Sequence, residues 1–73
     1  MSTVKITTAA DLGLVLRAVR RAHKLRLDDL AGVTGVGHVF VREVEHGKEA
    51  VQLGKVLKLL WELGIHVQLS LPD

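Results

Sequence analysis

The sequence predicts an all-α domain of four to five short helices with one β-strand at its C-terminal end. Three observations support this fold class. Apolar residues recur at helical spacing in four segments, glycines punctuate the chain from Gly32 onward, and the spacing changes to strict alternation after Gly64. A chain of 73 residues forms one domain and buries a modest core, so a second chain is a natural source of further stability.

Residues typical of helix ends indicate where the first two helices lie. Thr8 followed three residues later by Asp11 resembles a capping box, and an apolar stripe follows it. The stripe comprises Leu12, Val15, Leu16 and Val19. Asp28 and Asp29 favour the start of a second, short helix, because carboxylates suit the positive end of the helix dipole. Gly35 can adopt the left-handed conformation that ends this helix.

A third helix is expected over residues 38 to about 46, and a fourth over about residues 53 to 63. The apolar stripe of the fourth helix is expected to comprise Leu53, Val56, Leu57, Leu60 and Leu63. Leu59 and Trp61 lie off this stripe, so the helix is apolar on more than one face. We interpret the second face as a partner surface and Trp61 as a dimer anchor, because aromatic residues are enriched at interfaces.

The segment after Gly64 has the pattern of a half-buried strand. Its apolar residues, which alternate with polar ones, are Ile65, Val67, Leu69 and Leu71. A lone strand leaves its backbone groups unpaired, so it must pair with residues 4–6 or with its copy in a second chain. We favour pairing across a homodimer, with Trp61 and the four alternating residues at the interface, while the pairing with residues 4–6 stays open.

Two short helices joined by a glycine-containing turn are the pattern of a helix-turn-helix unit. The turn is expected at Thr34–Gly37, with Leu30 and Ala31 facing the core and Val36 between the helices. Such a unit places the N-terminal residues of its second helix in the major groove of DNA. The sequence therefore predicts a protein that binds double-stranded DNA.

The segment Phe40–Lys48, which reads Phe-Val-x-x-x-Glu-x-Gly-Lys, is similar to the third helix of HipB-type antitoxins in the repressor/Cro-like (XRE) helix-turn-helix family. The resemblance covers residues 6 to about 71 and implies a lambda-repressor-like fold. We accordingly divide the chain into an N-terminal arm (1–7), a helix-turn-helix DNA-binding domain (8–64) and a C-terminal dimerisation strand and tail (65–73).

The same resemblance implies a function and two partners. The chain would be a homodimeric, sequence-specific transcriptional repressor that binds a palindromic operator and acts as the antitoxin of a HipA-like serine/threonine kinase toxin. Two alternatives are a phage- or plasmid-type regulator without a toxin and a protein-interaction module that has lost DNA binding. The second is suggested by Leu27, Val39 and Glu43, which stand where the family usually has uncharged polar residues.

The resemblance also implies residue roles. The positions that face the bases fall on His38, Val39, Arg42 and Glu43. The positions that face phosphates fall on Arg26, His46 and Lys48. Arg20 is expected to form a structural ion pair with Glu45 that orients the recognition helix. Arg42 could bind a guanine, Val39 could contact a thymine methyl, and Glu43 could accept from a cytosine amine or be paired internally.

Composition excludes other classes of function. The chain has no cysteine, and its histidines match no zinc spacing, so no metal or cofactor is expected. It has no Ser/His/Asp set, phosphate-binding glycine loop or acid–base pair in a pocket, so we do not expect an enzyme. No apolar run has the length of a membrane span or signal peptide, which predicts a cytoplasmic protein without a membrane partner. The net charge of +2 permits a polyanionic partner without requiring one.

Overall fold

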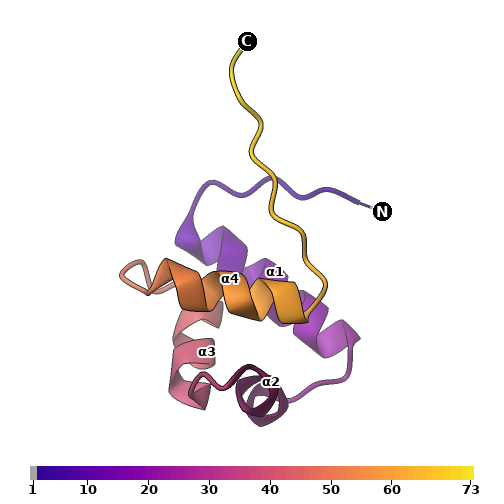
Figure 1. Cartoon of the computed structure of the whole chain (residues 1–73), viewed down its shortest axis with the longest axis vertical. Helices are drawn as coiled ribbons and strands as arrows, with labels where there is room; N and C mark the ends of the chain where they lie inside the picture. Colours follow the sequence, from indigo (N-terminus) through magenta and orange to yellow (C-terminus); the bar gives the residue numbers. More distant parts are fainter. Residues whose placement is uncertain (1) are drawn as a thin grey trace.

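A computed structural model of the chain describes residues 2–73 and contains four helices. They are α1 (Ala9–Ala22), α2 (Leu27–Thr34), α3 (His38–Glu45) and α4 (Leu53–Glu62). Figure 1 shows α2 and α3 at one end of the molecule, while the segments that lead to the two termini extend from the other end. The all-α fold class is confirmed. None of these helices is long and apolar enough to cross a membrane.

The capping box at the start of α1 is present. The backbone N–H of Asp11 donates to the Thr8 hydroxyl at 3.0 Å, and the backbone N–H of Thr8 donates to the Asp11 carboxylate at 3.1 Å. The N–H of Thr7 donates to the same carboxylate at 3.0 Å. These bonds satisfy N–H groups that the first helical turn leaves without partners. The expected arm, residues 1–7, begins at Met1, which lies outside the described residues.

The backbones of α1 and α3 come unusually close together at Gly13. A β-carbon at this position would lie 2.4 Å from the carbonyl oxygen of Val44 and 2.6 Å from that of Glu45. Real β-carbon contacts essentially never fall under 3.0 Å. Glycine at position 13 therefore sets the separation of α1 from α3, and with it the position of the helix expected to contact DNA.

The hydrophobic core draws on all four helices and on the turn between α2 and α3. Its largest fully buried side chains are Leu16, Leu30, Val41 and Leu59. Val36, in the turn, is also buried in this cluster, as the sequence predicts. Helix α3 packs against α1 and α2, while α4 packs against α2. The helix-turn-helix unit is thus held on two sides by the rest of the domain.

The expected apolar stripe of α4 is only partly right, because three of its five residues are buried and two are exposed. Leu59 was placed off the stripe, yet it is fully buried. Two residues placed on it, Leu53 and Leu57, are 67% and 44% exposed, and Trp61 is 74% exposed. The buried residues of this segment are Val56, Leu59, Leu60 and Leu63. Both sets recur at helical spacing, so the pattern alone did not determine which one faces the core.

The expected C-terminal strand is not formed within the single chain. No strand is assigned in residues 2–73, and the segment from Ile65 to Leu71 leaves α4 as extended coil (Figure 1). Residues 3–6 and 67–70 line one shallow pocket, yet no backbone hydrogen bond joins these two segments. Within residues 2–73 the intrachain pairing is therefore absent, because a strand needs a backbone partner and neither segment supplies one to the other. Pairing across a homodimer stays a prediction.

Candidate nucleic-acid interface

The turn between α2 and α3 has the geometry of a helix-turn-helix unit. Gly35 ends α2 in the left-handed conformation, with φ of 77°, and its N–H donates to the carbonyl of Ala31 at 2.9 Å. The buried hydroxyl of Thr34 donates to the carbonyl of Leu30 at 2.7 Å, so this polar group is satisfied inside the core. Gly37 then occupies the N-cap position of α3. The chain reverses between two short helices in three residues.

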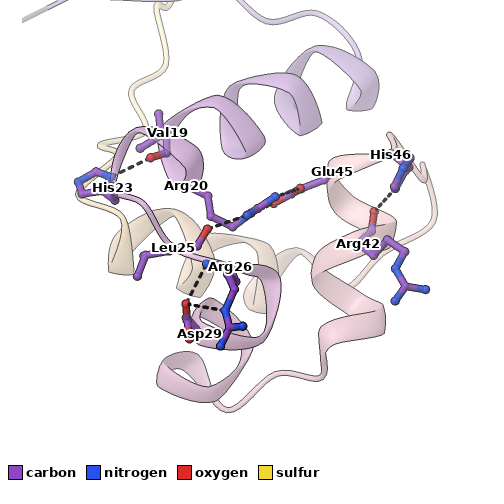
Figure 2. A network of polar contacts seen from close by, with 9 residues as sticks. All are labelled: Val19, Arg20, His23, Leu25, Arg26, Asp29, Arg42, Glu45 and His46. Atoms are coloured by element: carbon purple, nitrogen blue, oxygen red, sulfur yellow. Dashed lines mark hydrogen bonds and ion pairs between the residues drawn. The ribbon is translucent and has the colours of Figure 1, made fainter.

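The outer face of α3 carries most of the side chains that the sequence places against the bases. Val41, Val44 and Glu45 are buried on the inner face. The exposed residues are His38, Val39, Arg42 and His46. Arg42 points away from the Arg20–Glu45 pair and from the body of the domain (Figure 2). The structure therefore presents a continuous exposed face with one arginine near its centre.

Glu43 and Lys48 contact each other at the C-terminal end of α3. The ammonium of Lys48 lies 2.8 Å from the Glu43 carboxylate. Their backbones are joined as well, since the N–H of Lys48 donates to the Glu43 carbonyl at 3.0 Å and the N–H of Gly47 donates to the Val44 carbonyl at 3.0 Å. Gly47 has φ of 82°, so these bonds form a Schellman motif. In the free chain Glu43 is paired internally, and its contact with a cytosine amine stays a prediction.

His46 is fixed at the end of the same helix. Its ring Nδ1 lies 2.8 Å from the carbonyl oxygen of Arg42, one turn earlier. A carbonyl only accepts, so Nδ1 carries the proton and Nε2 is the remaining polar atom of the ring. His23 makes the matching contact with the Val19 carbonyl at the end of α1, at 2.8 Å (Figure 2). His46 is thus oriented by the helix end while its other nitrogen stays available for a ligand.

The ion pair between Arg20 and Glu45 is present and buried. The guanidinium donates to both carboxylate oxygens, through Nε at 2.6 Å and Nη2 at 3.0 Å (Figure 2). Its Nη1 donates to the carbonyl of Leu25 at 2.7 Å. The hydrogen bond to Glu45 raises the pKa of Arg20 above its ordinary value, against the opposing effect of burial. This contact joins α1, the segment before α2 and the end of α3.

The remaining cationic candidates lie at the edges of the unit. Arg26 is exposed at the N-cap of α2, where its backbone N–H donates to the Asp29 carboxylate at 2.9 Å (Figure 2). Lys55 was not singled out from the sequence, yet its ammonium lies over the ring of Phe40, 5.6 Å from the centroid. A cation held against α3 from the first turn of α4 is well placed beside the recognition helix. The sequence signal that could have found it is its place in the first turn of α4.

No family model matches the chain. A curated relative, the uncharacterized HTH-type transcriptional regulator y4mF of Sinorhizobium fredii, is 46% identical over 68 residues, which span 93% of this chain and 90% of the relative. The chain belongs to the HTH-type transcriptional regulators. Among solved structures, the restriction-modification controller protein C.AhdI from Aeromonas hydrophila matches the regulator with 34% identity and a TM-score of 0.71, covering 80% of this chain and 88% of that one.

HipB structures share the fold of the regulator over nearly its whole length. A chain of the HipA-HipB-O2-O3 complex superposes with a TM-score of 0.86 at 20% identity and covers 97% of this chain and 100% of that one. A chain of the HipB-O1-O2 complex gives 0.85 at 20% identity, with 93% and 99% covered. The expected helix-turn-helix fold is therefore confirmed by independent structures.

Proposed function

We propose that this regulator is a homodimeric repressor that binds duplex DNA with α3 in the major groove. The observation that carries the proposal is the outer face of α3, which is exposed and polar apart from Val39, while the inner face is held by the core and by the Arg20–Glu45 pair. In helix-turn-helix proteins the second helix enters the groove and the two half-sites of a dimer lie about 10 bp apart. A palindromic operator follows from such a dimer.

The residues of the face suit different parts of the DNA. Arg42 can donate two hydrogen bonds to the edge of a guanine, and Val39 can contact a thymine methyl group. His38, at the N-terminal end of α3, reaches the groove from the same side. Arg26 and Lys48 suit phosphate oxygens, which set the position of the protein without reading the sequence. His46 can donate to a phosphate from Nε2 only when both of its ring nitrogens carry protons.

Binding to the DNA upstream of the regulator's own gene tests this proposal. We expect fluorescence anisotropy to show tight binding that weakens steeply as salt rises, because phosphate contacts release counterions. Arg42→Ala should lower affinity at the operator by about ten- to a hundredfold per protomer, the cost of one bidentate base contact. Arg17→Ala, which removes the same charge from the exposed side of α1, is the matched control. Absence of binding by the wild type would favour the interaction-module alternative.

We further propose that the regulator is the antitoxin of a HipA-like serine/threonine kinase. Support comes from the HipB structures, which match nearly the whole chain, one of them in a complex with HipA. A regulator without a toxin is the second candidate, because the controller protein shares more residues with this chain, at 34% identity. Co-expression with the product of the adjacent gene, followed by the mass of the purified complex, separates the two. A stable complex with a kinase-like protein supports the antitoxin, and its absence supports the plain regulator.

A further inference from the structure

The end of α3 differs from the other helix ends of this chain in one respect. Schellman motifs bring two side chains together, one from the last turn and one just beyond the helix, and that contact is usually apolar. At the end of α4 the two residues are apolar, Leu60 and Ile65, and the N–H of Ile65 donates to the Leu60 carbonyl at 2.9 Å. At the end of α1 they are Arg20 and Leu25, whose backbones are joined in the same way at 3.1 Å. At the end of α3 the corresponding residues are Glu43 and Lys48, and their side chains form an ion pair.

Stabilisation of the folded state does not account well for this ion pair. The Lys48 and Glu43 side chains are 49% and 37% exposed, and pairs in contact with water contribute little to folding. A carboxylate in the second half of a helix also lies toward the negative end of the dipole. Glu43 further puts a negative charge beside Arg42, on the element proposed to approach a polyanion. A role in binding accounts for the pair better than a role in folding does.

We propose that the Glu43 carboxylate binds Lys48 in the free protein in place of a DNA phosphate oxygen, and that the lysine moves from the carboxylate to the phosphate when duplex DNA binds. This inference rests on the proposed function. The carboxylate and the phosphate offer Lys48 the same ligand chemistry, an anionic oxygen at hydrogen-bond distance. The exchange leaves the Glu43 carboxylate unpaired, and this anion attracts a cation from solution, so the net release of ions is smaller than for a lysine that starts unpaired. Glu43 therefore lowers affinity for duplex of any sequence and flattens the salt dependence.

The proposal is testable because Glu43→Gln and Lys48→Gln should change the affinity for duplex DNA in opposite directions. We expect Glu43→Gln to raise affinity for the operator duplex and for a scrambled duplex by the same factor, up to about fivefold per protomer, the range of an exposed ion pair. The slope of log affinity against log salt should steepen by about one per protomer. Lys48→Gln should weaken binding to both duplexes and make the slope shallower. In the Lys48→Gln background, Glu43→Gln should have a clearly smaller effect on affinity.

A base contact by Glu43 would give another pattern. Glu43→Gln would then weaken binding to the operator alone and leave the scrambled duplex and the salt slope unchanged, which would overturn the inference and leave the proposed function standing. An unchanged affinity for both duplexes would also overturn it. Both side chains are partly exposed, so the variants are expected to stay folded, with circular dichroism melts within a few degrees of the wild type.

A readout without DNA separates failure of this inference from failure of the proposed function. The NMR signal of the Lys48 Cε should shift when Glu43→Gln removes the pair in the free protein, and again when heparin is added to the wild type as a polyanion. If the wild type bound no duplex, the proposed function would fail. If the Lys48 signal responded neither to Glu43→Gln nor to heparin, the inference would fail whatever the DNA result.

Discussion

The guanidinium of Arg20 and the carboxylate of Glu45 face each other with two hydrogen bonds, at 2.6 and 3.0 Å, across the junction of α1 and α3. Both side chains are nearly excluded from water, with 9% and 4% of their surface exposed. Arg20 also holds the carbonyl of Leu25, so one guanidinium fixes three segments of the domain. In the described residues no buried side-chain polar atom is without a partner. The recognition helix is thus oriented by a satisfied polar contact as well as by apolar packing.

Removal of one partner of this pair should destabilise the domain strongly. We expect Glu45→Ala to lower the free energy of unfolding by about 3–5 kcal/mol, because the buried Arg20 charge would lose its partner. Urea unfolding followed by circular dichroism measures the change. Glu49→Ala, at an exposed site, is the control and should change stability by less than about 0.5 kcal/mol. A double variant, Arg20→Met with Glu45→Leu, should recover much of the loss; if it were no more stable than Glu45→Ala, the unpaired charge would not be the cause.

The close approach of α1 and α3 makes Gly13 a second sensitive position. Gly13→Ala would place a β-carbon 2.4 Å from the Val44 carbonyl oxygen, so the two backbones must separate. We expect a loss of about 1–3 kcal/mol, the usual cost of overpacking. Gly54→Ala is the matched control in α4, where a β-carbon meets nothing within 4 Å. It should stabilise the protein by about 0.5–1 kcal/mol through helix propensity. Equal effects of the two changes on the melting temperature would contradict the close approach.

Features that depend on a few neighbouring residues could be predicted from the sequence. Contacts between distant residues, and the choice between two apolar faces of one helix, could not. Thr8 with Asp11, and the glycines at 35 and 47, were predictable because caps and left-handed turns depend on a few neighbouring residues. The register of α4 was not, since Leu59 and Leu57 both belong to apolar stripes. The Arg20–Glu45 contact joins residues 25 positions apart and was implied only by family resemblance. Pairing of the C-terminal segment across a homodimer would need a second chain, so it stays a prediction.

The end of α1 carries backbone strain that a glycine would relieve. Lys24 has φ of 58°, in the left-handed region, while the corresponding residues after α3 and α4 are Gly47 and Gly64. We expect Lys24→Gly to raise the free energy of unfolding by about 1 kcal/mol, because the β-carbon of an L-residue is disfavoured there. Lys24→Ala is the control: it removes the charge and keeps the β-carbon, so it should bring no gain. Thermal unfolding ranks the three proteins, and a gain from both variants would assign the effect to the charge.

The start of α1 should make stability depend on acid pH. Hydrogen bonds from the Thr7 backbone and hydroxyl, and then from Thr8, lower the pKa of the Asp11 carboxyl below its ordinary value of 3.8. A lowered folded-state pKa means that Asp11 stabilises the fold above the unfolded-state pKa and that this contribution is lost as pH falls through the folded-state pKa. Melting temperatures between about pH 2 and pH 6 should therefore fall less steeply in Asp11→Asn than in the wild type.

A control distinguishes the two contacts of Thr7 with Asp11. Thr7→Val removes the hydroxyl bond and keeps the backbone bond, so it should retain most of the pH dependence. If Asp11→Asn melted with the same pH profile as the wild type, the capping box would not be the source of the acid sensitivity.

The exposed apolar residues of α4 and the C-terminal segment should lie at a homodimer interface. Trp61 is the single tryptophan of the chain, and it is 74% exposed in the single chain, so its fluorescence reports on the interface directly. We expect its emission to shift to the blue as protein concentration rises and sedimentation equilibrium to give the mass of two chains. Removal of residues 67–73, which form no helix and are exposed, should yield a folded monomer with unchanged helical circular dichroism. Trp61→Ala should weaken the dimer without unfolding it. A dimer that survived both changes would place the interface elsewhere, and one lost only with Trp61→Ala would assign it to α4 without strand pairing.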